Sequence, residues 1–207
     1  MKGNISILRD YVPEEAASII AEWINDSGCK FKISKSRATK FGDYRPPHQG
    51  KGHRISVNGD LNPYAFLVTA VHEFAHLKTW NEHKTLVKPH GLAWKRNFKV
   101  LMDVFFELEV FPTDIKTAVH NYLKNPKASS CSDIHLFRAL REYDEAKEDH
   151  HTVETLPHQS VFSLKNGRVF KKGEKLRKRY RCIEVDTGRI YLFNPIAEVK
   201  LIRVNTF

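Results

Sequence analysis

Residues 62–80 read NPYAFLVTAVHEFAHLKTW, and this stretch decides the fold. Asn62 is a preferred residue for a helix N-cap, and Pro63 suits the first helical position because no backbone N–H is needed there. The apolar sequence AFLVTAV then runs directly into HEFAHLKTW. We therefore expect one long apolar helix, which carries several polar side chains in its second half.

Three of those polar side chains, His72, Glu73 and His76, form an HExxH motif. Residues four positions apart lie on one helical face, so both imidazoles can reach a single ion. Glu73 lies about 100° around the helix from His72, so it can contact a metal-bound water without being a ligand. Because burying these groups unpaired is costly, the motif predicts a metal site, and its spacing is typical of zinc.

A catalytic zinc needs a third protein ligand, which leaves one position for water. The metzincin pattern HExxHxxGxxH is excluded, because positions 79 and 82 hold neither Gly nor His. His90 follows His76 by fourteen residues, at the start of the next predicted helix, and the spacing favours it as the third ligand. Glu82 and His83 remain open as alternatives, because both follow the HExxH helix closely.

The sequence around this helix predicts a mixture of helices and strands. Apolar periodicity favours helices at residues 13–26, about 91–106, 113–124 and 132–143. Alternating residues favour strands at 30–34 (KFKIS) and 53–58 (HRISVN), with a loop rich in Gly, Pro and basic residues between them.

HEFAH at 72–76, followed by HGLAW at 90–94, resembles the SprT-like domain pattern, in which an HGxxF-type segment follows HExxH. Trp94 stands where that segment usually has Phe. SRATKFGDYRP (36–46), HRISVN and CSDIHLF (131–137) are also similar to the family, so the resemblance covers roughly residues 5–140. It implies a zincin-like α+β fold, with helices packed on a small sheet. It also implies His72, His76 and His90 as zinc ligands and Glu73 as the catalytic base.

The resemblance implies a hydrolase, a zinc metallopeptidase acting on a protein or peptide. Glu73 would take a proton from zinc-bound water and deliver it to the leaving amine. An extended substrate would add to the strand at 53–58 as a further strand. Tyr44, Arg45 and His53 lie upstream of the helix, and we interpret them as structural or loop residues rather than stabilisers of the oxyanion.

After residue 145 the character of the sequence changes. Residues 146–158 are polar, acidic and rich in histidine, which predicts a linker between a domain at 1–145 and a second domain at 159–207. Turn signals at 166–167 and 186–188 separate short β-type runs, which favours a small antiparallel β domain. The three cysteines form no CxxC pair, so the domain departs from family members with a cysteine zinc ribbon and is expected to hold no metal. Cys182 is expected to be buried.

The chain is strongly basic, with a net charge of +10, and residues 165–181 hold nine Lys or Arg against one Glu. Clustered cations favour a polyanionic partner, and Phe170 and Tyr180 would suit base stacking. The alternative is a hairpin with a solvated basic face and two core aromatics. We favour nucleic acid, because clustering of the charge is harder to explain than net charge alone. The resembling family includes a protease of proteins crosslinked to DNA, which points the same way and favours DNA in particular. The candidate contacts are Lys171, Lys172, Lys175, Arg177, Lys178, Arg179 and Arg181.

No apolar run is long enough to span a bilayer, and the first residues lack the layout of a signal peptide. Scattered cysteines suit a reducing compartment. We therefore expect a cytoplasmic protein, nucleoid-associated if bacterial, with no membrane partner. The leading hypothesis is a zinc metallopeptidase acting on nucleic-acid-associated proteins. Its rivals are a non-enzymatic zinc-containing nucleic-acid-binding or regulatory protein, and a zinc hydrolase acting on something other than a peptide.

Overall fold

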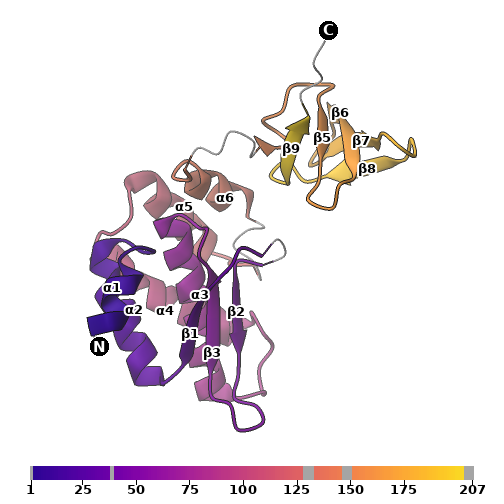
Figure 1. Cartoon of the computed structure of the whole chain (residues 1–207). Helices are drawn as coiled ribbons and strands as arrows, with labels where there is room; N and C mark the ends of the chain where they lie inside the picture. Colours follow the sequence, from indigo (N-terminus) through magenta and orange to yellow (C-terminus); the bar gives the residue numbers. More distant parts are fainter. Residues whose placement is uncertain (1, 38–39, 128–132, 146–150, 203–207) are drawn as a thin grey trace. The chain divides into compact units, whose positions relative to one another are not determined.

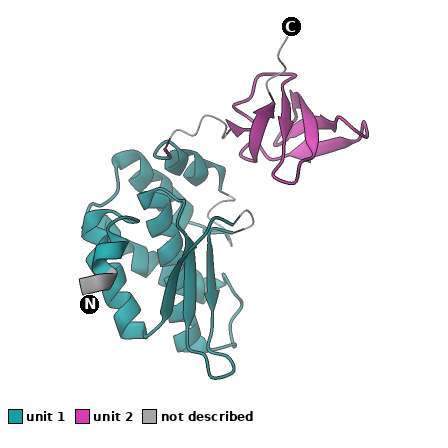
Figure 2. Cartoon of the chain, in the orientation of Figure 1, with its two compact units in different colours: residues 1–144 teal, residues 145–207 magenta. Residues whose placement is uncertain are grey.

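The computed structural model describes residues 2–37, 40–127, 133–145 and 151–202. The chain divides into two compact units, Met1–Asp144 and Glu145–Phe207 (Figure 2). Each unit has its own hydrophobic core.

Unit 1 is an α+β domain, which agrees with the predicted fold class (Figure 1). Its helices and strands are, in order, α1 (Lys2–Leu8), α2 (Glu14–Ser27), β1 (Lys30–Ser34), β2 (Gly42–Arg45), β3 (Arg54–Asn58), α3 (Pro63–His83), α4 (Leu92–Glu107), α5 (Thr113–Leu123) and α6 (Ile134–Arg141). The helices predicted at 13–26, 91–106, 113–124 and 132–143 correspond to α2, α4, α5 and α6. Helix α1 was not predicted.

Helix α3 is the centre of unit 1. Asn62 caps it through Oδ1, which accepts a hydrogen bond from the backbone N–H of Ala65 at 2.9 Å, as the sequence predicts. Its side-chain amide also donates to Leu140 O, which ties the start of α3 to the end of α6. Residues from Ala65 to Ala75 are buried without interruption. The helix therefore runs through the core, packed against α4 on one side and β2 and β3 on another.

The sheet of unit 1 has the order β1-β3-β2. Strand β3 pairs in parallel with β1, in the register Phe31↔Ile55, and antiparallel with β2, in the register Tyr44↔Ile55. The strands at 30–34 and 53–58 confirm the prediction. Strand β2 differs from the prediction, because its residues lie in the loop that the sequence predicts between those two strands. Since β3 is paired on both sides, the prediction that it offers a free edge to a substrate is wrong; the edge strand beside α3 is β2.

Unit 2 is an antiparallel sheet, as predicted for this part of the chain. Its strands are β4 (His151–Thr152), β5 (Val161–Ser163), β6 (Val169–Lys175), β7 (Tyr180–Glu184), β8 (Ile190–Phe193) and β9 (Glu198–Ile202), in the order β4-β9-β5-β6-β7-β8. The meander β5 to β8 is joined by β9, which returns to pair with β5. Cys182 is fully buried in the core of this unit, as expected.

The predicted linker at 146–158 extends too far. Residues 146–150 lie outside the described residues, but His151 and Thr152 form β4, which pairs with β9. Val153 and Leu156 are buried in the core of unit 2. The second unit therefore begins before residue 159. The sequence does not indicate the core positions Val153 and Leu156, because most of the surrounding residues are polar.

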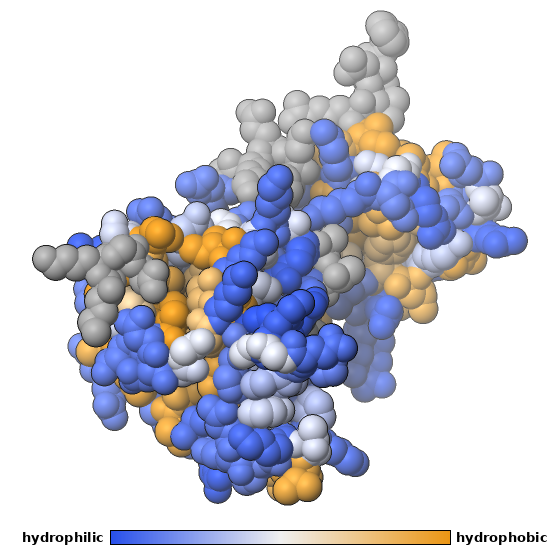
Figure 3. All heavy atoms as spheres, turned by 60° about the horizontal axis from the view of Figure 1, so that its bottom comes forward, coloured by the Kyte–Doolittle hydropathy of each residue, from blue (hydrophilic) through white to orange (hydrophobic). Residues whose placement is uncertain are grey.

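Hydrophilic side chains cover much of the face seen in Figure 3, with hydrophobic ones reaching the surface in scattered patches. Among the described residues, no helix is both long and apolar enough to cross a membrane.

Candidate metal centre

Helix α3 presents three functional side chains to one side: His72, Glu73 and His76. His72 and Glu73 are each only 6% exposed, although they lie in the most apolar part of the helix. Two other polar residues of this part of the helix, Thr69 and Thr79, donate their hydroxyls to the carbonyl oxygens four residues earlier. Two imidazoles and a carboxyl group are thus held in a rigid, buried segment.

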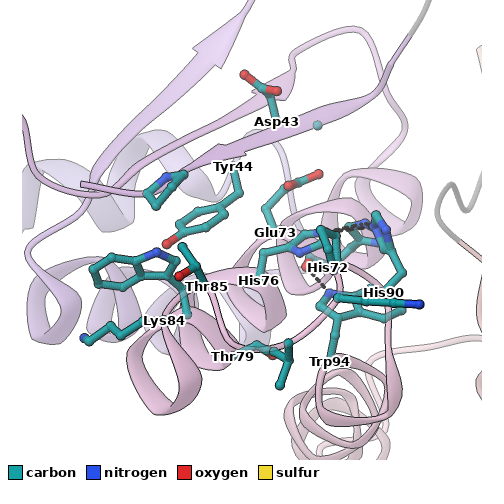
Figure 4. Close-up of a pocket in the computed structure, with 16 residues that line it drawn as sticks. Asp43, Tyr44, His72, Glu73, His76, Thr79, Lys84, Thr85, His90 and Trp94 are labelled. Carbon is teal, nitrogen blue, oxygen red and sulfur yellow. Dashed lines mark hydrogen bonds between the residues drawn. The ribbon is translucent and has the colours of Figure 1, made fainter. Parts of the chain in front are cut away.

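His90 comes from the connection between α3 and α4. The chain reverses after His83 and enters α4 at Leu92, with Gly91 as the N-cap. His90 itself has a φ of 57°, in the left-handed region that non-glycine residues rarely adopt. Such strain persists where the surrounding structure imposes it, and it is concentrated at functional sites. Here the backbone turn directs the His90 ring toward the α3 histidines (Figure 4).

The three histidines converge through their Nε2 atoms. The distances are 3.3 Å between His76 and His72, 2.9 Å between His76 and His90, and 3.3 Å between His90 and His72. Three nitrogens bound tetrahedrally to zinc at ordinary bond lengths lie about 3.3 Å apart. Neutral imidazoles alone do not account for this triangle, because each Nε2 is either a donor or an acceptor and two of the three must be alike. A cation that accepts all three lone pairs fits the triangle.

Trp94 forms an apolar wall behind this triangle. Its ring centroid lies 4.7 Å from that of His72, 5.3 Å from that of His76 and 4.7 Å from that of His90, and the side chain is fully buried. Its indole N–H donates to the carbonyl oxygen of His72 at 3.4 Å. Trp94 therefore orients all three rings, which explains the aromatic residue at this position of the HGLAW segment.

The three histidines are kept neutral. Burial lowers the pKa of each ring, and the pKa of His76 falls to about 3. The proximity of His90 lowers the pKa of His76 further, and both neighbours do the same for His72. Neutral rings keep the lone pairs that a metal requires.

This arrangement predicts how the stability of the metal-free protein depends on pH. Unfolded histidines take up protons below a pH of about 6.5, whereas the lowered pKa values of the three folded rings delay that uptake to lower pH, so their contribution to stability is lost as pH falls. Glu73, neutral when folded up to a pKa of about 8, acts in the opposite sense, but it is one group against three. We expect urea unfolding of chelator-treated protein to show stability falling from pH 6.5 to 5. The slope should be shallower in His76→Ala, and equal slopes would contradict the assignment.

Glu73 points to the gap between α3 and β2 (Figure 4). Burial raises the pKa of its carboxyl group to about 8, and the charge of Asp43 raises it as well. The positive charges of Arg37 and Lys40 oppose this shift. The backbone N–H of Tyr44, in β2, donates to the carboxyl group and also lowers its pKa. The edge strand thus fixes the orientation of Glu73, and a carboxyl group with a pKa near neutrality suits proton transfer.

Gly42 makes room for that carboxyl group. A Cβ atom at this position would overlap Glu73 Oε1 and lie 2.8 Å from Thr69 Cγ2. Gly42→Ala should therefore displace Glu73 while leaving the histidines in place. We expect the peptide hydrolysis that the HExxH motif predicts to be slower by about 10²-fold, because a displacement of about 1 Å at a reacting group has that effect. The zinc content of the variant should be unchanged. Gly52→Ala is the matched control, since its Cβ meets nothing within 4 Å. Equal activity in the two variants would contradict this role.

The histidines and Glu73 line an open cleft of about 610 Å³ (Figure 4). One wall comes from β2, the floor from α3, and the other wall from the α3–α4 connection. The lining residues are Gly42, Asp43, Tyr44, Pro46, His72, Glu73, His76, Thr79, Trp80, Lys84, Thr85, Val87, Lys88, Pro89, His90 and Trp94.

The alternative third ligands do not join the histidine triangle. Glu82 accepts a hydrogen bond from Asn97 at 2.7 Å and pairs with Lys78 at 3.1 Å. His83 lies beside Glu82 and does not line the cleft. Within the described ranges, His72, His76 and His90 are the only group of three ligand side chains close enough to share an ion.

Of the three upstream residues interpreted as structural or loop residues, Tyr44 lines the cleft, whereas Arg45 and His53 do not. The Tyr44 ring is parallel to that of His76 at a centroid distance of 6.1 Å, and its hydroxyl lies 3.0 Å from His53 Nδ1. The GDYR segment contains Tyr44, but its place in the cleft can be predicted only if these residues are known to form a strand next to α3.

The candidate nucleic-acid contacts of unit 2 differ in their exposure to solvent. Lys172 is only 5% exposed, and its ammonium donates to the carbonyl oxygens of Glu154 and Leu156. Phe170 is fully buried. Neither is available to a phosphate or a base, so both predicted contacts are wrong. Tyr180 is half-buried, and six candidate cations are exposed: Lys171, Lys175, Arg177, Lys178, Arg179 and Arg181.

Comparisons of the chain with models of protein families, with curated proteins and with solved structures give no match. The similarity to the SprT-like pattern therefore rests on the sequence motifs alone.

Proposed function

We propose that this protein is a zinc-dependent peptidase of the SprT-like kind, with His72, His76 and His90 as ligands and Glu73 as general base. The observation that carries the proposal is the triangle of Nε2 atoms, 2.9–3.3 Å apart, which opens into a cleft beside a buried carboxyl group. Three neutral imidazoles suit zinc, and three protein ligands leave a fourth position free.

When bound there, zinc supplies Lewis acidity that polarises a carbonyl and makes water more acidic. Glu73, whose raised pKa a bound cation beside it would lower, accepts the proton of the attacking water at its carboxylate and delivers it to the nitrogen of the leaving amine. The backbone N–H of Tyr44 keeps the carboxyl group in place during both transfers. Trp94 and Phe98 shield the His72 ring from water, because both are fully buried against it.

Strand β2 suits the binding of an extended peptide. Among the described strands it pairs with β3 alone, and its residues Gly42, Asp43 and Tyr44 line the cleft. The free edge of a strand offers main-chain donors and acceptors to a peptide in extended conformation. The substrate is therefore a peptide or an unfolded protein segment, laid along β2 with its scissile bond next to Glu73.

The rival hypothesis is a structural zinc in a non-enzymatic protein. A closed structural site has four protein ligands, and a buried Glu73 beside the ion has no function in it. The test is to measure bound zinc together with self-cleavage, with and without double-stranded DNA, in the wild type and in Glu73→Gln. We expect cleavage only in the wild type. Bound zinc with no cleavage in either protein would favour the structural zinc.

A second function, nucleic-acid binding by unit 2, is favoured by the six exposed cations on β6, β7 and the turn between them. Removing one cation that neutralises a DNA phosphate reduces the slope of log affinity against log salt by about 0.9. Replacing Arg177, Lys178 and Arg179 together by Gln should therefore weaken the binding of duplex DNA to the full chain and lower that slope by up to about three.

The control for this measurement carries the same change of charge in unit 1, with Gln at Lys30, Lys32 and Lys99, which are all exposed. If the unit 1 variant loses as much affinity and slope as the unit 2 variant, the binding reflects net charge alone and the assignment to unit 2 is wrong.

A further inference from the structure

The α3–α4 connection holds a second strained residue besides His90. Residues 83–86 form a tight turn, closed by a hydrogen bond of 3.0 Å from the N–H of Leu86 to the carbonyl oxygen of His83. Lys84 occupies its second position with φ 51° and ψ −124°. These are the angles of a type II′ turn, a position that strongly favours glycine because a Cβ is crowded there. A lysine at this position indicates a use for its side chain.

His90 provides a comparison within the same connection. Between residues 84 and 91, Lys84 and His90 are the two non-glycine residues with positive φ, and both line the cleft. The strain at His90 places a ring in the histidine triangle. The strain at Lys84 places an ammonium in the same cleft, and Nζ lies 4.1 Å from the centroid of the Trp80 ring, a favourable cation–π contact.

The two walls of the cleft differ in charge. Asp43 is paired with Lys40 at 2.8 Å and with Arg45 at 2.9 Å, so its charge is already balanced. Lys84 and Lys88 are both exposed, and neither forms an ion pair with a described residue. The wall formed by the α3–α4 connection is therefore cationic, and it contributes no carboxylate to the cleft lining.

Figure 4 shows Lys84 and Thr85 on the side of the cleft away from His90, with Tyr44 across from them. The Tyr44 hydroxyl, the Thr85 hydroxyl and the Trp80 ring line this part of the cleft together with Lys84. The Tyr44 hydroxyl already shares a hydrogen bond with His53 Nδ1. The cation, the Thr85 hydroxyl and the aromatic face remain, and they form a suitable environment for a carboxylate attached to an apolar chain.

We propose that Lys84, supported by Lys88, forms a carboxylate-binding subsite that selects peptides with a negative charge near the scissile bond. The inference rests on the proposed peptidase function and specifies its substrate class. The carboxylate comes either from the side chain of an acidic residue or from the C-terminus of the substrate. Because the ammonium groups are exposed, the selectivity is modest, on the order of fivefold at low ionic strength, and it decreases with salt.

The test is a binding measurement that needs no turnover. Zinc-loaded Glu73→Gln protein is titrated with N-acetylated octapeptides, and the change in tryptophan fluorescence gives the dissociation constant. One series moves a single Glu along a neutral, C-amidated sequence; a matched series has Gln instead, and a third neutral peptide has a free C-terminus. We expect tighter binding for Glu at one position or for the free C-terminus, and the two arms identify the source of the carboxylate. Equal binding of all the peptides would overturn the proposal.

Three substitutions in the same background assign the effect to Lys84. Lys84→Gln should abolish the preference, and Lys84→Glu should reverse it in favour of peptides with Lys. Lys84→Gly should also abolish it, while raising the melting temperature, because glycine relieves the strained turn. Lys99→Glu, an exposed residue of α4 outside the cleft lining, makes the same change of charge and should leave the preference intact. A preference that survives in Lys84→Glu would also overturn the proposal.

The two proposals fail in different ways. If the peptides bind with the expected preference and the wild type cleaves none of them, the subsite is retained and the peptidase function is wrong. If the wild type cleaves neutral and acidic peptides with equal kcat/KM, the function is retained and the subsite is wrong.

Discussion

Glu73→Gln should reduce peptide hydrolysis by roughly 10²–10⁴-fold, which is the contribution expected of a general base. The amide keeps the shape of the side chain but cannot accept the proton of the attacking water. Because Glu73 is not among the three converging ligands, the zinc content should stay that of the wild type. The measurement is kcat/KM on a quenched fluorescent peptide, together with metal analysis of the same samples.

The thermal stability of Glu73→Gln is a second readout. Glu73 is buried and its pKa is raised to about 8, so a neutral amide at this position avoids the cost of burying a charged carboxylate. The melting temperature should therefore not fall below that of the wild type. Full activity in a folded, zinc-loaded Glu73→Gln protein would remove Glu73 from the mechanism.

His90→Ala should abolish stable zinc binding and, with it, activity. Loss of a partner that only orients a metal ligand already costs about 10–100-fold in metal affinity, so removing a ligand should cost more than that. His72 and His76 alone would leave two open positions, which water or a buffer fills. The measurement is a zinc titration against a chromophoric chelator, in parallel with the activity assay.

His83→Ala is the matched control for this variant. His83 belongs to the same stretch of chain and was an alternative ligand on sequence grounds, but it lies beside Glu82 outside the cleft lining. We expect it to retain wild-type zinc affinity. If zinc were lost in His83→Ala and kept in His90→Ala, the ligand set would have to be reassigned.

The sequence predicts best the features whose signals are local. Asn62 and Pro63 mark the start of α3, and Gly28, with a φ of 59°, ends α2 as its C-cap. The spacing of His72 and His76 places both rings on one helical face without any tertiary information. Identifying His90 as the third ligand requires tertiary information, because its position depends on how the α3–α4 connection reverses. Spacing alone leaves Glu82 and His83 open as alternatives.

The features that were missed depend on tertiary contacts. Strand β2 has the sequence GDYR, which is poor in β-forming residues, and it is held by pairing with β3 and by packing on α3. The close approach of Gly42 to Glu73 follows from that pairing. Lys172 was predicted to be a surface cation because its neighbours are basic, but the alternation of β6 turns it inward, where two carbonyl oxygens accept from its ammonium.

The central claim is that three imidazoles hold a zinc whose fourth position is open to water. X-ray absorption at the zinc edge of the zinc-loaded wild type tests it most directly. The account predicts three imidazole nitrogens at about 2.0–2.1 Å and one further light-atom ligand that is exchanged when a small anion is added. A fourth protein ligand that does not exchange, or a protein that holds no zinc, would contradict it.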